Sequence, residues 1–309
     1  MIHRRLLMIV LCAVVAMSVT VVQAEEIKLK QDGLTLNGNL RLAPGKRIAD
    51  GVILMTHGGL AHYGMHTISN LQQLFSDAGY STLAINLSLG LDNRHGMYDC
   101  KIPHRHRQQD AIGEIDAWMG WLHERGVTSV TLLGHSRGGA QTAWYAMERK
   151  PKLANAVVLL APATADNGGK GYQQRYGQPL EPVLSRARAL VDAGNGKTLV
   201  PHANMMFCRD TSVSAESFVS YYGPNPRLDT PWLLPRIDKP VLVVVAGQDD
   251  TVVGLDKKIQ PLLGHGKLEM TVVDGANHAF QDLFGDDVVA AVDAFLKKRV
   301  GRQFSPGSQ

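Results

Sequence analysis

The chain has 309 residues and a formal net charge of +4. This charge is small, and no run of Lys and Arg forms a basic stripe, so the composition argues against a nucleic-acid-binding protein. The length is sufficient for one large α/β domain and does not require two.

The N-terminal segment 1–24 has the pattern of an export signal. A positive start, MIHRR, precedes an apolar run over 6–22, and small residues at 22–24 offer a cleavage site. The run is also about as long as a short membrane-spanning helix, so a retained anchor is the alternative. Cleavage removes two arginines and lowers the charge from +4 to +2. We therefore expect an exported chain, periplasmic or secreted, with no stable membrane span once the signal is removed.

Two cysteines, Cys100 and Cys208, lie beyond this segment. In an oxidising compartment they have one possible internal pairing, which makes a disulfide one interpretation. Two unpaired thiols far apart are the other, because a sequence says nothing about the distance between them. The sequence leaves both open.

Residues 25–309 predict a single α/β domain. Its first predicted element, at 26–43, is an antiparallel β-ribbon with one exposed face. Polar and apolar residues alternate there around turn signals at 32–33 and 37–38. Continuous apolar runs, typical of strands buried on both faces, then alternate with helical patterns. The predicted strands are 51–59, 80–88, 129–136 and 155–163, and the predicted helices are 68–78, 108–125 and 138–150.

The alternation stops over about 164–239. This interval has no buried-strand run and only two helical pieces, near 182–193 and 215–222. The alternation then resumes with strands at 240–248 and 267–275 and helices at 255–263 and 286–299, before a polar tail at 301–309. Such an order predicts a mostly parallel sheet with helices on both faces. The interruption predicts a small cap over the carboxyl ends of the strands, where open α/β sheets bind ligands.

A serine lies between glycines where a predicted strand meets a predicted helix. Gly134-His135-Ser136-Arg137-Gly138 has the form G-x-S-x-G in the strand-to-helix context that gives this pattern its meaning. A nucleophile on so sharp a turn has a strained backbone, and side chains two residues to either side would collide. A glycine-rich turn with a serine N-cap is the alternative explanation.

A nucleophilic serine needs a base, and the base needs an orienting acid. The strand at 240–248 leads into Asp249 and Asp250, and the strand at 267–275 is followed by His278. All of these lie at the same sheet end as Ser136, in the chain order Ser, Asp, His.

With these residues the chain resembles the α/β-hydrolases over about 51–299. The resemblance implies Ser136 as nucleophile, His278 as general base and, from the family spacing counted from Gly247, Asp250 as the acid. Asp249 is the alternative acid.

The resemblance also implies an oxyanion hole. One amide would come from Arg137, after the nucleophile, and the other from Gly59, in a segment similar to the His-Gly loop of the family. A simple βα turn is the alternative for that segment. His57, Leu60 and His135 are the neighbouring candidates for substrate contact.

A loop rich in histidine invites a metal interpretation. Basic residues are interleaved with the candidate ligands and no recognised zinc spacing is present, so we expect no metal. A cationic lip that favours acidic substrates, with Arg105 as its test residue, is one hypothesis, although a solvated loop is the favoured interpretation. The candidate ligands are His95, Asp99, Cys100, His104 and His106.

Met205, Met206 and Phe207, inside the interruption, could contact an acyl group or form the small core of the cap. The second interpretation is favoured.

The expected activity is that of a carboxylesterase-like serine hydrolase working through an acyl-enzyme on a small-molecule ester, without a cofactor. The alternatives are a peptidase or amidase, a thioesterase or a lactonase with the same residues, or a non-catalytic binding protein on the same scaffold. The natural substrate and the oligomeric state do not follow from the sequence.

Overall fold

The computed structural model describes residues 24–264 and 267–301. The predicted signal segment, apart from Ala24, and the tail beyond Gly301 lie outside the described residues. Within the part that is described, no helix combines the length and the apolarity needed to cross a bilayer.

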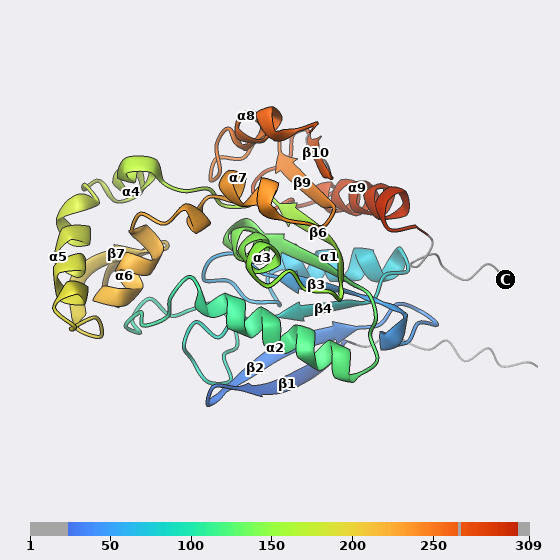
Figure 1. The fold of residues 1–309 in the computed structure, drawn as a ribbon, viewed down its shortest axis with the longest axis horizontal. Coiled ribbons are helices and arrows are strands. Elements are labelled where there is room, and N and C mark those ends of the chain that lie inside the picture. Colours follow the sequence, from blue (N-terminus) through green and yellow to red (C-terminus); the bar gives the residue numbers. More distant parts are fainter. Residues whose placement is uncertain (1–23, 265–266, 302–309) are drawn as a thin grey trace, which may run out of the picture.

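An eight-stranded sheet forms the centre of the molecule (Figure 1). Its spatial order is β1-β2-β4-β3-β5-β6-β9-β10. The six strands from β4 to β10 are parallel to one another, whereas β1 and β2 add an antiparallel ribbon at one edge. The predicted mostly parallel sheet with an N-terminal ribbon is therefore confirmed. The strands are β1 (Glu25–Gln31), β2 (Leu34–Arg41), β3 (Val52–Thr56), β4 (Thr82–Ile85), β5 (Val130–His135), β6 (Ala154–Leu160), β9 (Val241–Ala246) and β10 (Leu268–Val273).

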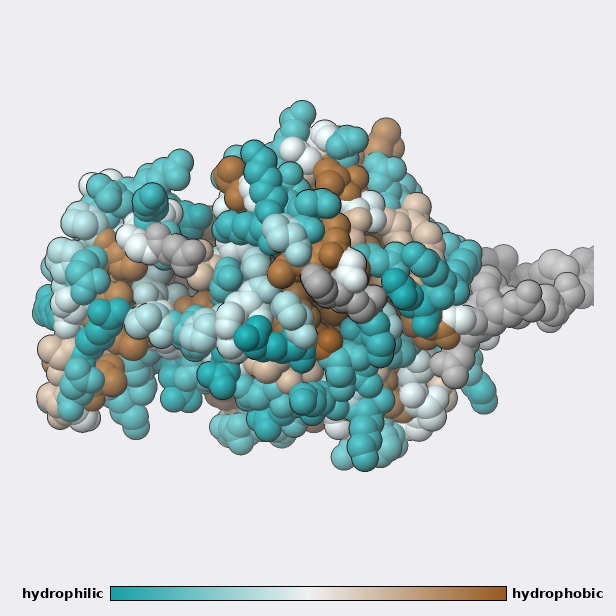
Figure 2. Space-filling model, turned by 45° about the horizontal axis from the view of Figure 1, so that its top comes forward, coloured by the Kyte–Doolittle hydropathy of each residue, from teal (hydrophilic) through white to brown (hydrophobic). Residues whose placement is uncertain are grey.

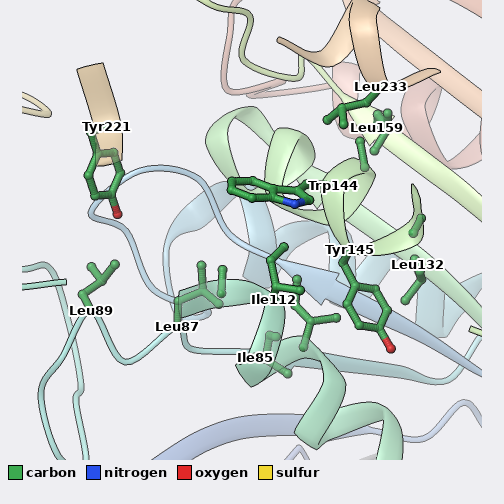
Figure 3. Packing of buried hydrophobic residues seen from close by; sticks show 14 of the residues in the cluster. Ile85, Leu87, Leu89, Ile112, Leu132, Trp144, Tyr145, Leu159, Tyr221 and Leu233 are labelled. Carbon is green, nitrogen blue, oxygen red and sulfur yellow. The ribbon is translucent and has the colours of Figure 1, made fainter. Parts of the chain in front are cut away.

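Helices cover both faces of this sheet, and this explains the continuous apolar runs of the inner strands. Every residue of β3, β4, β5 and β9 is buried. On one face α2 and α3 bring Ile112 and Trp144 onto Leu132 and Leu159 (Figure 3). On the other face α1 and α9 form a second core. The helices of the body are α1 (His66–Asp77), α2 (Asp110–Glu124), α3 (Ser136–Arg149), α7 (Thr230–Leu233), α8 (Leu255–Ile259) and α9 (Phe284–Arg299).

The ribbon differs from its prediction at one turn signal. Asp32 and Gly33, with φ of 49° and 81°, turn the chain between β1 and β2 as predicted. Asn37-Gly38 instead lies inside β2. A Cβ at Gly38 would lie 2.9 Å from the Trp118 ring, so this glycine lets a helix side chain approach the strand closely.

The interval between β6 and β9 contains a lobe beside the body, and we call its residues 170–222 the cap (Figures 1 and 2). Two of its features were not predicted from the sequence: α4 and a hairpin, β7–β8, which forms a separate two-stranded sheet. The strands LVPHANM and CRDTSVS are polar and one contains a proline, so neither resembles a buried strand. The cap elements are α4 (Lys170–Tyr176), α5 (Glu181–Asp192), β7 (Leu199–Met205), β8 (Cys208–Ser214) and α6 (Ala215–Tyr222).

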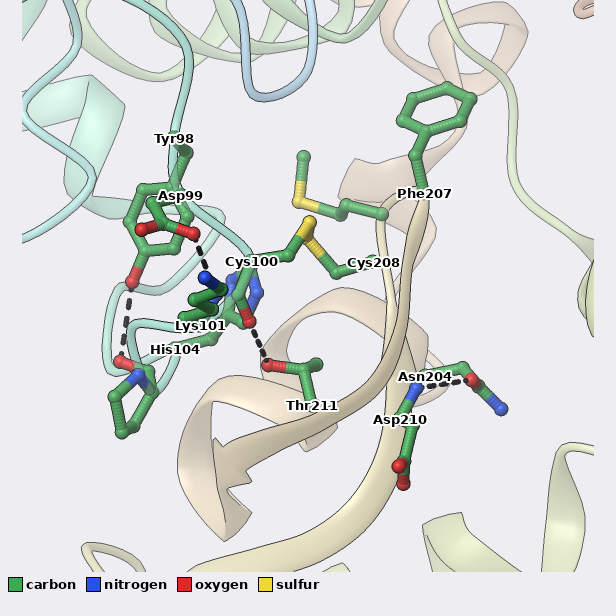
Figure 4. The surroundings of a disulfide bond; sticks show 12 residues. Tyr98, Asp99, Cys100, Lys101, His104, Asn204, Phe207, Cys208, Asp210 and Thr211 are labelled. Carbon is green, nitrogen blue, oxygen red and sulfur yellow. Dashed lines mark hydrogen bonds between the residues drawn. A yellow bond between two sulfur atoms is a disulfide. The ribbon is translucent and has the colours of Figure 1, made fainter.

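A disulfide fastens the cap to the body. Cys100, in the loop before α2, is bonded to Cys208 at the start of β8, 108 residues further along the chain (Figure 4). The same loop follows the edge of the hairpin. The His104 amide donates to the Ser212 carbonyl, and the Ser214 amide donates to the His104 carbonyl, each at 2.8 Å. Of the two interpretations that the sequence leaves open, the structure contains the disulfide.

Candidate active site

Ser136 lies at the turn between β5 and α3 with a φ of 55°, a left-handed conformation that is costly for a non-glycine residue. The turn depends on its glycines. A Cβ at Gly134 would lie 2.6 Å from the Gly138 carbonyl oxygen, and one at Gly138 would lie 2.1 Å from the His57 carbonyl oxygen. The predicted strained turn is therefore present, and side chains at either glycine position would collide with backbone.

The loop after β10 brings His278 onto this serine. Its Nε2 lies 2.8 Å from Ser136 Oγ, and its Nδ1 lies 2.8 Å from Asp249 Oδ2. With Nδ1–H donating to the carboxylate, Nε2 is free to accept the serine proton. The three side chains form a continuous hydrogen-bonded chain from hydroxyl to carboxylate, built at the carboxyl ends of β5, β9 and β10.

The preference for Asp250 was wrong in this geometry. Asp250 is exposed and accepts a hydrogen bond from the Thr251 hydroxyl at 3.1 Å. Asp249 points inward, with 3% of its side chain exposed. The chain turns immediately after β9, where the Asp249 amide donates to the Ala246 carbonyl, and this turn directs the second residue after Gly247 toward the histidine.

Asp249 is held as a carboxylate. Burial alone would raise its pKa, but the hydrogen bonds from His278 and from the backbone amides of Val252 and Thr251 outweigh that effect and leave the pKa below its usual value. Both amides donate to Oδ1 at 2.8 Å, so the two carboxylate oxygens have separate partners. A charged, fixed carboxylate stabilises an imidazolium at His278.

The loop after β3 lies against the serine. A Cβ at Gly58 would come within 2.8 Å of Ser136 Cβ, and Gly59, with a φ of 46°, lines the same cavity as Ser136 and Arg137. The Arg137 amide is in the first turn of α3, where helix N–H groups have no partner inside the helix. The two residues predicted to supply the oxyanion donors thus lie beside Ser136.

The three candidates for substrate contact do not line this cavity. His57 is fully buried, and its Nδ1 donates to the Gly58 carbonyl. Its Nε2 accepts from the Leu87 amide at 3.1 Å and lies 3.0 Å from Arg94 Nη2. Burial, reinforced by Arg94, puts the pKa of His57 well below its usual value, so the ring is neutral.

Leu60 and His135 are buried as well. Leu60 is 4% exposed and belongs to the main core. His135 directs its Nε2 to the His278 carbonyl at 2.8 Å, and burial lowers its pKa to about 4. These side chains therefore support the loops around the site instead of facing a substrate, which corrects the prediction.

A buried cation behind the loop after β3 was not predicted from the sequence. Arg94 is 5% exposed, and it donates to the carbonyls of Leu87, Gly96 and Ala61 at 2.6–2.8 Å. Burial lowers its pKa only to about 10, so it remains charged near neutral pH. Two of its partners, His57 and Ala61, come from the loop after β3, and no local pattern in the sequence predicts such a contact.

The histidine-rich loop is only partly solvated, so the favoured interpretation holds for His95 and Asp99 but not for His104 and His106. His104 Nδ1 lies 3.1 Å from His106 Nε2, and His106 Nδ1 lies 2.8 Å from the Tyr221 hydroxyl of the cap. Both histidines are buried. Cys100 is bonded in the disulfide and is not a free thiolate. Across residues 24–264 and 267–301, no three His, Cys, Asp or Glu side chains form a group that could hold a metal ion.

The cationic lip is also not found where it was expected. Arg105 is exposed and donates to the Lys197 carbonyl at 3.3 Å, outside the cavity over Ser136.

That cavity has a volume of about 700 Å³, suited to a small molecule, and the cap supplies much of its wall. The tip of the β7–β8 hairpin lies over the serine: Met206 and Phe207 both have positive φ, 49° and 82°. Their amides donate to the Tyr222 and Tyr176 hydroxyls, each at 3.0 Å. Met205 is cap core, as favoured, whereas Phe207 is 60% exposed and lines the cavity.

Comparisons with known proteins agree with this architecture. A sequence model described as "Alpha/beta hydrolase family" matches residues 53–292. No curated protein sequence matches. Among solved structures, Est1E from Butyrivibrio proteoclasticus is 17% identical with a TM-score of 0.62, and the alignment covers 89% of this chain and 98% of Est1E.

Two further solved structures are similar. The esterase Pf2001 of Pyrococcus furiosus is 15% identical with a TM-score of 0.58, over 90% of both chains. An E-2-(acetamidomethylene)succinate hydrolase is 18% identical with a TM-score of 0.57, over 89% of this chain and 100% of that one. At these identities the likeness is one of fold.

Proposed function

Because the chain belongs to the alpha/beta hydrolase family, we propose that it is a serine hydrolase that cleaves carboxylic esters. The single observation that carries the proposal is the hydrogen-bonded chain from Ser136 through His278 to Asp249, with 2.8 Å at both links. This chain lies under a cavity of about 700 Å³ and beside two residues whose amides can bind an oxyanion. Every role that acyl transfer requires has a residue in place.

The reaction would proceed in two displacements. His278 Nε2 accepts the proton of Ser136 as Oγ attacks the ester carbonyl carbon, and the amides of Gly59 and Arg137 stabilise the oxyanion that forms. Collapse of the intermediate breaks the bond to the alcohol oxygen, which takes the proton from His278, and leaves an acyl group on Ser136. Water then gives its proton to His278 and attacks the same carbon, releasing the acid and restoring the serine.

The neighbouring structures favour an ester over the other bonds that this chemistry can cleave. Pf2001 is named an esterase, and another similar structure is of an esterase domain from Rhodothermus marinus. Amidase, thioesterase and lactonase reactions would use the same residues in the same roles. A non-catalytic binding protein would have no need for a strained serine with a paired histidine and carboxylate.

We also propose that the protein is exported and acts in the periplasm or outside the cell. The charged start, apolar run and small-residue site of segment 1–24 support export. The Cys100–Cys208 disulfide supports it independently, because such bonds persist in oxidising compartments.

A fluorophosphonate probe tests the activity directly, because it modifies only an activated serine. We expect the purified protein to be labelled and to hydrolyse nitrophenyl esters, and Ser136→Ala to abolish labelling and lower kcat by about 10⁶. Ser185→Ala, a change at an exposed serine of α5, is the matched control and should keep both properties. Thioester, lactone and anilide substrates in the same panel report the bond preference.

Two results would contradict the proposal. Labelling that survives in Ser136→Ala would place the reactive group elsewhere. A folded wild-type protein that neither takes the probe nor hydrolyses any acyl substrate would leave the binding-protein alternative.

A further inference from the structure

The Arg137 side chain is a partly buried cation with no acidic partner in the described part of the chain. No carboxylate oxygen of residues 24–264 and 267–301 lies within 4 Å of its guanidinium. In contrast, the exposed Arg107 forms an ion pair with Asp110. Its hydrogen bond is a long one, 3.4 Å from Nη1 to Gln108 Oε1. Arginine is seldom buried without an anion, so this guanidinium has donors to spare.

The guanidinium lies where two cavities meet. Arg137 lines the 700 Å³ cavity over Ser136 and also a second cavity of about 630 Å³ between the cap and α7. It follows the nucleophile directly in the chain. A group bound by its side chain would therefore lie within one arginine length of the carbonyl that Ser136 attacks.

Neighbouring side chains fix this position. The guanidinium carbon lies 5.4 Å from the centre of the Tyr221 ring, within reach of a cation–π interaction. The backbone of Gln108, the hydrogen-bond partner, is itself held. Its backbone amide donates to Ser220 Oγ at 2.8 Å, and its backbone carbonyl accepts from Gln141 Nε2 at 3.2 Å. Both supports come from the loop and cap that the disulfide joins. The orientation of the guanidinium is therefore partly set before an anion binds, which lowers the entropy cost of binding.

The rest of the cavity over Ser136 adds positive charge. Lys170, Arg175 and Lys258 also line it, against the carboxylates of Asp166 and Asp250. The Asp166 oxygens are already occupied, because they accept from the amides of Gly171 and Tyr172 at 2.8 Å. The cavity therefore has four cations against two carboxylates, and this excess of positive charge concentrates anions.

We propose that the substrate is an ester that carries a carboxylate, and that the Arg137 guanidinium binds that carboxylate. The proposal rests on the ester hydrolysis proposed above and names its substrate class. Guanidinium and carboxylate form paired, charge-assisted hydrogen bonds, and partial burial strengthens them relative to a surface pair. Arg137 then makes two contacts with the substrate: its backbone amide binds the oxyanion, and its guanidinium binds the carboxylate. Together these contacts orient the scissile bond.

Matched pairs of substrates test this recognition. One pair carries the acid on the acyl side, 4-nitrophenyl hydrogen adipate against its methyl ester. The other carries it on the alcohol side, 4-acetoxybenzoate against its methyl ester. The measured quantity is the ratio of kcat/KM for the acid to kcat/KM for the neutral ester. We expect Arg137→Gln to lower that ratio at least about tenfold for one pair, with Arg137→Lys in between because a lysine keeps the charge but not the paired donors.

Arg105→Gln is the matched control, since Arg105 is an exposed arginine outside the cavity. Its ratios should equal those of the wild type. Melting temperatures of all variants establish that the comparison is between folded proteins. An unchanged ratio in Arg137→Gln for both pairs would overturn the proposal while leaving ester hydrolysis standing.

A binding measurement separates this proposal from the proposed function. Calorimetry with monomethyl adipate and with 4-acetoxybenzoate on Ser136→Ala needs no turnover, and we expect at least about tenfold weaker binding of one of them when Arg137→Gln is added. If no acyl substrate is hydrolysed but this binding depends on Arg137, the anion site stands and the esterase does not. If both compounds bind equally well with and without the guanidinium, the anion site falls, whatever the activity.

Discussion

Asp249 and Asp250 are adjacent, yet only Asp249 contacts His278. Asp249→Asn should therefore lower kcat by about 10³–10⁴ with a small change in KM, because an amide cannot hold the Nδ1–H tautomer or stabilise the imidazolium. Asp250→Asn keeps the shape of the cavity rim and should cost less than about tenfold in kcat/KM. Steady-state kinetics on one neutral nitrophenyl ester measures both.

The pair of variants also decides between the two carboxylates. A large loss of kcat in Asp250→Asn with a mild one in Asp249→Asn would mean that the working enzyme uses the acid favoured by sequence spacing, and that the loop after β9 rearranges when substrate binds.

The residues of the candidate site divide into those that a linear pattern reveals and those that it does not. Ser136 could be placed because it follows a continuous apolar run typical of a buried strand, and His278 because it follows the next predicted strand after the acid in the chain order Ser, Asp, His. The choice of acid depends on one turn after Gly247, which shifts the frame by a single residue. Arg94 was beyond reach, since its burial depends on carbonyls from segments that meet only in the folded chain.

At the scale of elements, the β7–β8 hairpin carries a strained tip. Phe207 has a φ of 82° and a ring that is exposed in the cavity, with the Arg175 guanidinium carbon 4.5 Å from its centre. Figure 4 shows it extending from the hairpin away from the disulfide. Because this strained backbone lies at the same cavity as Ser136, we expect the Phe207 ring to contact substrate.

Phe207→Gly tests this role. Glycine relieves the positive φ, a gain of about 1 kcal/mol, and loses a cation–π contact of similar size, so the free energy of unfolding should change by less than about 1 kcal/mol. In contrast, kcat/KM on long-chain or aromatic esters should fall about tenfold, because the cavity loses an apolar wall. Denaturant titration and ester kinetics on the same preparation check both.

Phe207→Ala is the useful companion, since it removes the ring but keeps the strain. It should match Phe207→Gly in activity and be the less stable of the two. If neither variant loses activity toward large esters, the tip does not contact substrate.

Strands could be predicted from the sequence where burial on both faces requires a continuous run of apolar residues. β3, β5 and β9 were found for this reason. The hairpin β7–β8 was missed because its two strands pair only with each other as a sheet and carry polar residues throughout. Gly38 resembled a turn because sequence shows the missing side chain but not the Trp118 ring that requires its absence.

For the whole molecule, the loop before α2 joins the cap to the body. The disulfide, the histidine pair and the backbone pairing with β8 all lie on it, and the Tyr98 ring stacks on His104 at 4.6 Å. Sequence could indicate an interruption in the α/β alternation, but not that part of a polar, basic loop, including His104 and His106, would be buried under it. That burial has a consequence for stability, because the buried histidines must remain neutral.

We expect stability to fall steeply as the pH drops from 6.5 toward 4. Burial lowers the pKa of His106 to about 3 and of His104 and His135 to about 4, and that of His57 is also well below 6.5. Groups with a depressed folded-state pKa contribute stability that is complete above 6.5 and is lost as the pH falls toward the folded value. Glu114 acts in the opposite direction, because burial raises its pKa to about 7 and the folded state then holds a proton that the unfolded chain releases.

Near pH 5.5 unfolding therefore takes up about three protons, four on histidines less one from Glu114, and the free energy of unfolding should change by roughly 4 kcal/mol per pH unit. Urea titrations at pH 7.5, 6.5 and 5.5 measure this slope. His106→Phe should reduce it by about one proton, whereas His202→Gln, at a side chain that is 83% exposed, should leave it as in the wild type. A slope near zero between pH 6.5 and 5.5 would mean that the buried histidines do not stay neutral in the folded protein. An equal slope in His106→Phe would mean that the loop opens and exposes its histidines before the body unfolds.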